Sequence, residues 1–227
     1  MPELGPAFRP TALAISPAGV VTLAGEAPSL AARRRAILAC TTLPGVREVI
    51  DRLHVAPAAP MSDGEIVAHL AAAIARDRAF AGCGLRRRIG PRPEFEPLVA
   101  PAEGAACRID IAAEEGIVQL EGPVGGLASK RLAGVLAWWV PGVRDVINRL
   151  TPTPPEADAP IRLQEAVRLA LERDPCVPAG QVRVGVRMGV VRLSGALPSE
   201  ALREMAESDA WAVEGVAQVI NAIEVGR

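Results

Sequence analysis

Aromatic residues are scarce in this chain of 227 residues, at 3% of the sequence, and tyrosine is absent. Apolar residues still make up 50% of the chain, so hydrophobic cores must be built from Val, Leu, Ile and Ala. Cores made of these side chains will be small. The length allows one or two ordinary domains, or several small ones.

Lysine is nearly absent too, because Lys130 is the only one and arginine supplies the remaining basic charge. The formal net charge is -1, which argues against the strong positive field that attracts nucleic acid. The run of three arginines at 86–88 is short and is followed by Glu94 and Glu96. We therefore expect this run to lie in a solvated loop, and we expect no nucleic-acid partner.

Long hydrophobic runs are missing as well. The densest apolar stretch, 66–75, is shorter than the roughly 20 residues of a membrane-spanning helix and contains His69. The first ten residues lack a basic segment followed by an apolar one, so no secretory leader is visible. On this ground we expect a cytoplasmic protein, or a periplasmic one if the chain is a mature form that has lost its leader.

Catalytic signatures are also lacking. The sequence has no GxSxG nucleophile elbow, no phosphate-binding loop, no HExxH metal motif and no dinucleotide-binding glycine fingerprint. The adjacent Glu114 and Glu115 fall where a hairpin turn is expected and need no catalytic role. We therefore expect no enzyme activity, no cofactor and no bound metal.

The four cysteines form no CxxC pair; they are Cys40, Cys83, Cys107 and Cys176. Unpaired thiols in a reducing compartment are the expected state. The alternative is a Cys83–Cys107 bridge that closes a loop, and this would require an oxidising compartment. Zinc is not expected, because neither histidine stands at the spacing of a zinc finger.

What the chain does contain is a motif written three times. The motif is GVVTLAG from Gly19, GIVQLEG from Gly116 and GVVRLSG from Gly189, and a Gly-Val pair follows each after a constant interval. The pattern keeps its register without a gap over about 37 residues, which indicates a repeated small module. We assign a structural role to the repeat glycines, which are Gly19, Gly25, Gly45, Gly116, Gly122, Gly142, Gly189, Gly195 and Gly215.

The third repeat displays its elements most clearly. Apolar residues at helical spacing predict a helix over 161–171, and alternating residues predict strands over 182–186 and 190–194 that form a hairpin. A second helix is expected to start after Ser199 as its N-cap, and a last strand to cover 219–225. The expected order is helix, strand, strand, helix, strand.

The sequence therefore predicts three modules: module 1 at 8–57, module 2 at 61–152 and module 3 at 158–227. Module 2 carries a proline-rich insertion at 81–104, which we expect to be an extended surface loop. Module 1 has no room for the opening helix, so it is either incomplete or takes cover from a neighbour. Units of about 45 residues bury little surface alone, so we expect the modules to pack together.

This pattern resembles the BON domain family, named for bacterial osmotic stress and nodulation. In module 3 the resemblance rests on Gly189, Val190, Val191, Leu193, Gly195, Gly215, Val216, Val219 and Asn221. The other copies supply matching glycines, with Asp51 in place of the Asn in module 1. The resemblance implies an α+β fold of three tandem α-β-β-α-β modules, each a three-stranded sheet backed by helices, of which the first lacks its opening helix.

The resemblance also implies a function. Family members are non-enzymatic and are often periplasmic or attached to larger membrane-associated proteins, and phospholipid binding is their usual proposed role. We therefore expect weak multivalent binding to anionic phospholipid surfaces in envelope or osmotic stress. The alternatives are a soluble protein-interaction or self-assembly module, which would form homo-oligomers, and a cytoplasmic sensor of a small ligand such as potassium.

Four arginines match pairwise between modules 1 and 2: Arg47 with Arg144, and Arg52 with Arg149. Guanidinium groups bind phosphate through two parallel hydrogen bonds, so these four are the candidate lipid contacts. The alternative is an ordinary solvated face on which the arginines pair with acidic neighbours such as Asp145.

Trp138 and Trp139 are adjacent on the second helix of module 2 and point about 100° apart. Trp138 matches Trp211 of module 3, so we expect it in the core. Trp139 has no tryptophan counterpart. We expect it at an interface between modules or, alternatively, at the headgroup level of a membrane, where an amphipathic ring is stable.

Overall fold

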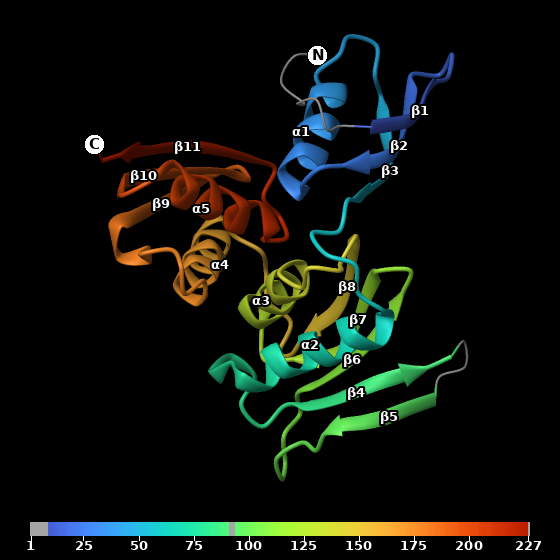
Figure 1. Ribbon diagram of the computed structural model, residues 1–227, viewed down its shortest axis with the longest axis vertical. Helices are drawn as coiled ribbons and strands as arrows, with labels where there is room; N and C mark the ends of the chain where they lie inside the picture. Colours follow the sequence, from blue (N-terminus) through green and yellow to red (C-terminus); the bar gives the residue numbers. More distant parts are fainter. Residues whose placement is uncertain (1–8, 91–93, 227) are drawn as a thin grey trace.

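The computed structural model describes residues 9–90 and 94–226, and over these residues the chain forms five α-helices and three β-sheets (Figure 1). Each sheet belongs to one module, and the sheets of modules 1, 2 and 3 have three, five and three strands. The α+β, modular fold is therefore confirmed. In every module a central strand pairs antiparallel with the strand before it and parallel with the strand that follows the helix.

Module 1 comprises β1 (Arg9–Ile15), β2 (Val20–Ala27), α1 (Leu30–Thr41) and β3 (Glu48–Val55). Ser29 caps α1, because its side chain accepts a hydrogen bond from the backbone N–H of Ala32. In the described part of the chain β1 is the first element of module 1.

Module 2 has the full set of elements: α2 (Asp63–Arg76), β6 (Arg108–Glu114), β7 (Ile117–Val124), α3 (Leu127–Trp138) and β8 (Asp145–Pro152). A capping box starts α2: the Ser62 side chain accepts from the backbone N–H of Glu65, and the Glu65 side chain accepts in return from Ser62. Ile66, Leu70 and Ile74 form the buried stripe of α2, at the spacing that the sequence predicts.

The insertion of module 2 is not the extended loop that its prolines suggest. After a short 3-10 turn (Arg78–Phe80), the insertion forms the paired strands β4 (Gly84–Ile89) and β5 (Glu94–Val99). β4 pairs parallel with β6, which widens the sheet to the order β5-β4-β6-β7-β8. The expected solvated arginine run lies on β4 instead. There the Arg86 guanidinium donates two hydrogen bonds, of 2.6 and 2.8 Å, to Asp110.

A disulfide joins Cys83 and Cys107, whose Cα atoms are 4.7 Å apart. The parallel pairing of β4 and β6 begins at the next residue of each strand, so strand register sets the two cysteines side by side. The expectation of unpaired thiols is wrong for this pair, and the alternative bridge is the one that forms. Cys40, which is buried, and Cys176, which is exposed, remain free thiols.

Module 3 repeats the complete order with α4 (Pro160–Arg173), a 3-10 turn (Ala179–Gln181), β9 (Val182–Arg187), β10 (Val190–Leu197), α5 (Glu200–Ala212) and β11 (Gln218–Val225). The second glycine of each motif bends the central strand. At Gly195, with φ 137°, an added Cβ would lie 1.9 Å from the carbonyl oxygen of Gln181. At Gly122, with φ 122°, the corresponding distance to Arg108 is 2.2 Å. Only glycine fits so close to a neighbouring backbone.

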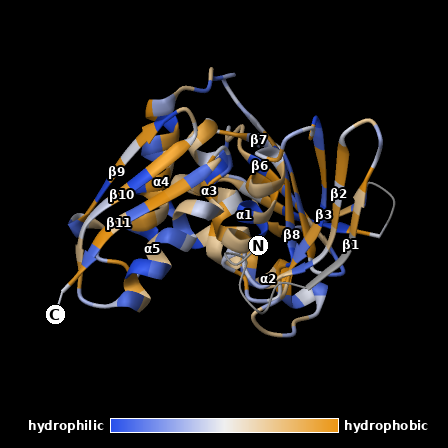
Figure 2. Ribbon diagram, turned by 90° about the horizontal axis from the view of Figure 1, so that it is seen from above, coloured by the Kyte–Doolittle hydropathy of each residue, from blue (hydrophilic) through white to orange (hydrophobic). Residues whose placement is uncertain are grey.

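The helices of the three modules meet at the centre of the molecule, and the sheets lie outside them (Figures 1 and 2). α3 packs against both α4 and α5, and α1 packs against α5. Trp138 and Trp139 are half-buried and touch the cores of both module 2 and module 3. The expectation that the modules pack together is therefore confirmed, and module 3 packs against both of the others.

Candidate functional site

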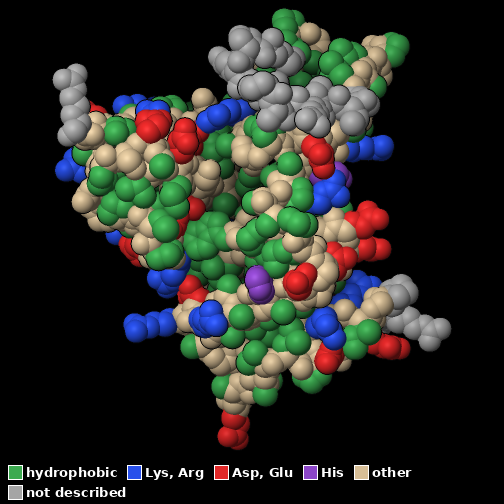
Figure 3. Space-filling view, in the orientation of Figure 1, with side chains coloured by type: hydrophobic (Ala, Val, Ile, Leu, Met, Phe, Trp, Pro, Cys, Tyr) green, Lys and Arg blue, Asp and Glu red, His purple; other side chains and the backbone are tan. Residues whose placement is uncertain are grey.

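Two of the four candidate lipid-contacting arginines are already engaged in ion pairs, and two are not. Arg144 pairs with Glu26 of module 1 at 3.1 Å, and Arg149 pairs with Glu121 at 3.3 Å. Arg47 and Arg52 are exposed and have no ion pair within the described residues. On the face drawn in Figure 3, acidic and basic side chains are interspersed, without a field of one sign.

The strand β3 separates two of these arginines. Arg47 immediately precedes β3, whereas Arg144 lies at its far end, where its carbonyl oxygen accepts a hydrogen bond of 2.8 Å from the backbone N–H of Val55. Eight strand residues at about 3.3 Å each keep the two apart. Positions that are equivalent in the repeat are thus not neighbours in space.

Trp139 lies between modules 2 and 3. Its indole Nε1 donates a 3.0 Å hydrogen bond to Oδ1 of Asp209 on α5, and its ring packs against both cores. Trp139 therefore lies at an interface between modules, which is one of the two positions that the sequence predicts. Trp211, the counterpart of Trp138, is 1% exposed in the core of module 3.

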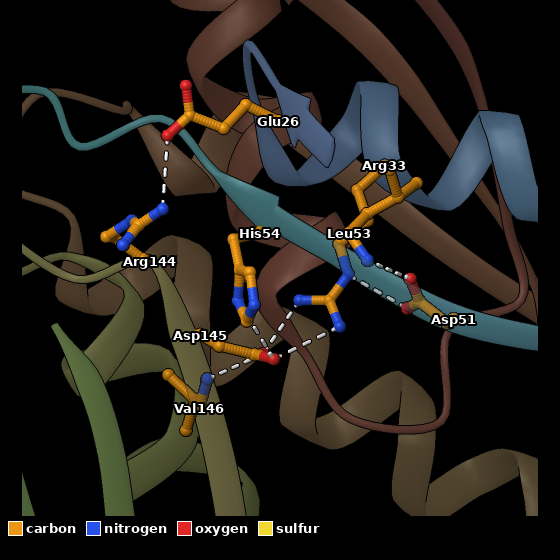
Figure 4. A network of polar contacts seen from close by, with 8 residues as sticks. All are labelled: Glu26, Arg33, Asp51, Leu53, His54, Arg144, Asp145 and Val146. Carbon is orange, nitrogen blue, oxygen red and sulfur yellow. Dashed lines mark hydrogen bonds and ion pairs between the residues drawn. The ribbon is translucent and has the colours of Figure 1, made fainter. Parts of the chain in front are cut away.

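A network of ion pairs connects module 1 to module 2, and Arg33 on α1 is its centre (Figure 4). Arg33 Nε donates to Asp51 at 2.9 Å, and its two terminal nitrogens donate to Asp145 of module 2 at 2.7 and 3.2 Å. Burial alone lowers the pKa of Arg33, but the pairs with Asp145 and Asp51 outweigh burial and raise it. Arg33 therefore stays charged and holds a carboxylate from each module.

Other polar contacts connect module 3 to its neighbours. Arg35 of module 1 pairs with Glu207 on α5. Arg131 on α3, which is 3% exposed, donates to the backbone oxygen of Glu214 at 2.8 Å and pairs with Asp158 at 2.7 Å. With the network around Arg33, these contacts fix the three modules as one body.

A cavity of about 310 Å³ lies where the three modules meet, between α1, β8 and the end of α5. Arg33, Asp51 and Asp145 line it, but they already pair with one another. Arg34, which also lines it, has a lowered pKa because of burial and the neighbouring charge of Arg33. Arg33 and Asp145 thus join modules 1 and 2 at this cavity.

In module 1 the strand β1 is exposed on the face of the sheet where α1 covers β2 and β3. Leu13 and Ile15 on β1 are 56% and 66% exposed, although their partners on β2, Leu23 and Val21, are buried. Directly paired residues of antiparallel strands point to the same face of the sheet. Leu13 and Ile15 therefore stand on the face that helices cover, but α1 packs only against β2 and β3 among the strands of its module.

A hollow of about 410 Å³ lies beside these two residues, at the end of the module where the hairpin turns. Residues 15–19 form one wall and residues 43–47 the other. Leu43 is 44% exposed there, and Arg47 is exposed at the rim. We call Leu13, Ile15, Leu43 and the hollow the open face of module 1.

Sequence reasoning did not select the residues of the open face. The only signal was the lack of room for an opening helix in module 1. β1 has the composition of an ordinary strand, so its exposure follows only from the missing cover.

Residues 9–90 and 94–226 contain no cluster of three or more His, Cys, Asp or Glu side chains placed to hold a metal ion. Over the same residues, no helix has both the length and the apolar character needed to cross a membrane.

Comparison with known proteins adds the family. The model of the BON domain matches residues 7–57, 104–154 and 162–227, which is more than half of the chain. No curated protein matches. Among solved structures, the chain is similar to the C-terminal domain of CdsD, the structural protein of the type III secretion system of Chlamydia trachomatis. It is 13% identical, with 95% of this chain and 90% of that chain covered and a TM-score of 0.27.

A second structure of CdsD from Chlamydia trachomatis is 14% identical, with 95% and 85% of the two chains covered and a TM-score of 0.27. Likenesses this weak carry no argument about fold or function. The three matches to the family model agree with three sheets built in the same strand order. The chain therefore belongs to the BON domain family, with three copies of the domain in tandem.

Proposed function

We propose that this chain is a non-catalytic scaffold that binds another protein through the open face of module 1. BON domains are generally non-catalytic binding domains. The observation that carries the proposal is the exposure of Leu13 and Ile15, at 56% and 66%, on a sheet face that is covered in the sister modules. Contiguous apolar surface that is rimmed by polar residues is typical of protein contacts.

The rigid attachment of module 1 supports this proposal. Its α1 is held to module 2 through Arg33 and to module 3 through Arg35. A fixed module presents its surface in one orientation, which lowers the entropic cost of binding. Modules 2 and 3 would then serve as the support that positions the open face.

The test replaces Ile15 by a photo-crosslinking amino acid in the full chain, expressed in its native cell. We expect adducts with protein at position 15 and none at Met188, which is 80% exposed on a turn of module 3 and serves as the control site. Adducts with lipid alone at position 15, or equal protein adducts at both positions, would contradict the proposal.

A phospholipid surface is the second candidate partner. It is favoured by one corner of module 1, where the exposed Arg47 lies beside the apolar Ile15 and Leu43. A basic and apolar corner suits the boundary between headgroups and acyl chains of an anionic membrane. This role would tie the chain to the bacterial envelope and to osmotic stress.

Sedimentation with phosphatidylglycerol vesicles tests the lipid role. Binding should weaken with salt and should be lost on Arg47→Glu with Arg52→Glu. The matched control is Arg144→Glu with Arg149→Glu, because both of these arginines already hold carboxylates. Binding that is unchanged by the first pair, or lost equally with the second, rules against lipid contact through module 1.

We also propose that the protein works in an oxidising compartment. The disulfide between Cys83 and Cys107 supports this, because such bonds persist in the periplasm and are rare in the cytosol. Fractionation of the native cell tests it: recovery of the protein with the periplasmic contents is the expected result, and recovery with the cytosol is the contrary one.

A further inference from the structure

We propose that the open face of module 1 binds an amphipathic α-helix of a partner protein, seated as α2 is seated on module 2. The proposal rests on the proposed protein-binding function and adds the chemistry of the partner. The strand register, the hollow and the charge at the rim of the hollow all favour a helix at this face.

The strand register shows which residues are equivalent. Leu13 pairs with Leu23 on the central strand of module 1, as Ile111 pairs with Leu120 in module 2. In module 3 the same place is taken by Val184. Ile111 is 0% exposed, because α2 packs on β6, and α4 packs in the same way on β9. Leu13 therefore faces the position that a helix occupies in both sister modules.

The hollow is the seat of the first turn of that helix. In module 2 an added Cβ at Gly142 would lie 2.6 Å from Cβ of Met61 and 3.1 Å from Cδ1 of Ile66, at the start of α2. In module 3 an added Cβ at the equivalent Gly215 would lie 3.0 Å from Nη2 of Arg131 and 3.6 Å from Cδ1 of Leu163 on α4. In module 1 the equivalent Gly45 has no described atom within 4 Å of such a Cβ.

The charge at the rim indicates what the first turn should carry. The first turn of α2 holds two acidic residues, Asp63 and Glu65, whereas the first turn of α4 holds none. Asp63 accepts hydrogen bonds of 3.0 and 2.9 Å from the backbone N–H groups of the hairpin turn at 115–116. The rim of the hollow in module 1 offers Arg47, which has no ion pair in the described part of the chain.

In the hairpin turn of module 1, the backbone N–H groups are bonded within the turn itself. Its turn is one residue longer than in module 2, and Ser16 closes it: the Ser16 backbone oxygen accepts from Gly19 at 3.0 Å and its Oγ accepts from Val20 at 3.1 Å. A partner helix therefore does not need to cap this turn. A carboxylate in its first turn would pair with Arg47 instead, where helix N-termini favour negative charge.

A helix fits these observations better than a second copy of the chain does. Among the described residues, α2 and α4 are already buried in their own modules and none is free to leave. A lipid surface would contact the same apolar residues, but it would not require a hollow placed like the one that receives the first turn of α2 in module 2. The expected partner segment carries apolar residues at the spacing of Ile66, Leu70 and Ile74, and an acid in its first turn.

The test uses the full chain and a fluorescent synthetic peptide of residues 60–77, which contains the whole of α2 with its cap. We expect saturable binding by fluorescence anisotropy. Ile15→Glu should weaken it at least about tenfold, since the charge would be buried under the peptide. The control chain carries Met188→Glu, and the control peptide has Ser in place of Ile66, Leu70 and Ile74.

The outcomes separate the possibilities. Binding that is lost with Ile15→Glu, kept with Met188→Glu and absent with the control peptide supports the proposal. No binding, or binding that Ile15→Glu leaves unchanged, overturns it. A dimer in sedimentation that Ile15→Glu dissociates overturns it in favour of a second copy. If the peptide fails while residue 15 still crosslinks to protein in the cell, the scaffold function stands and the helical partner does not.

Discussion

Asp209 is a buried carboxyl in the contact between modules 2 and 3. It is 3% exposed between modules 2 and 3, and its Oδ1 accepts a hydrogen bond from the indole Nε1 of Trp139. Burial raises its pKa to about 8, and the neighbouring carboxyl of Asp174 adds to the rise. The hydrogen bond from Trp139 acts in the opposite direction. Burial and the neighbouring Asp174 therefore favour the protonated carboxyl of Asp209 over the carboxylate, because they raise its pKa.

Asp209→Asn should stabilise the protein at pH 8 and leave it little changed at pH 5. The pKa of Asp209 in the folded state lies above its value in the unfolded chain, so stability falls as pH rises from about 4 toward 8. The amide cannot ionise and can keep the bond to Trp139. Because each pKa unit is worth about 1.4 kcal/mol, we expect a gain of about 2 kcal/mol or more at pH 8.

Urea unfolding of both proteins between pH 5 and pH 9 measures this effect. The expected curves converge at the acid end and separate toward pH 8. Parallel curves over the whole range would mean that Asp209 is charged in the folded state and that its buried environment is tolerated in another way.

At the scale of elements, the Cys83–Cys107 bridge ties the inserted hairpin to the sheet of module 2. It closes a loop of 24 residues, and a loop of this size contributes about 3 kcal/mol by restricting the unfolded chain. Cys83→Ser with Cys107→Ser should lower the free energy of unfolding by this amount. Cys176→Ser is the matched control, because Cys176 is exposed and forms no disulfide.

Thiol labelling of the unfolded protein without reductant checks the pairing itself. Two thiols should react, from Cys40 and Cys176, and four should react after reduction. Reaction of all four before reduction would show that the bridge is absent under the conditions of the preparation.

The sequence predicts most helices and strands because their signals are local. Helical spacing places α2 and α4, and alternation with a glycine turn places the hairpin of module 3. The inserted hairpin was missed because its prolines and arginines carry loop signals, while its strands are stabilised from a distance. Pro97 is tolerated because β5 is an edge strand, and Arg86 is satisfied by Asp110 of β6.

The candidate site was predictable only in part, for a similar reason. The repeat aligns Arg47 with Arg144, but sequence equivalence does not place residues together when each belongs to its own module. The interface role of Trp139 followed from its lack of a counterpart. Leu13 and Ile15 are ordinary strand residues, and only the packing of α2 and α4 on the sister sheets reveals that their cover is missing.

At the scale of the whole molecule, Arg33 is the main polar link between modules 1 and 2. Arg33→Met would leave Asp51 and Asp145 facing each other without the shared cation. The ion pairs of Arg33 are only partly buried. We therefore expect the free energy of unfolding to fall by about 2 kcal/mol, which is less than for fully buried pairs. Residues 56–60, which connect modules 1 and 2, should become easier for a protease to cleave.

Limited proteolysis and hydrogen exchange of α1 would detect this loosening. Arg149→Met is the control, because it removes an exposed pair that is worth less than about 1 kcal/mol. If both variants behave alike, the modules are held together by apolar packing and the network around Arg33 contributes little.

The central claim is that Leu13 and Ile15 are exposed on the helix side of the module 1 sheet, whereas Ile111 at the equivalent place in module 2 is buried under a helix. Methyl NMR with a soluble paramagnetic agent tests this directly, because the agent broadens the signals of exposed methyl groups. The methyl groups of Leu13 and Ile15 should broaden as Met188 does, while those of Ile111 remain sharp. Leu13 and Ile15 signals as protected as those of Ile111 would mean that the face is already covered, and would contradict the account.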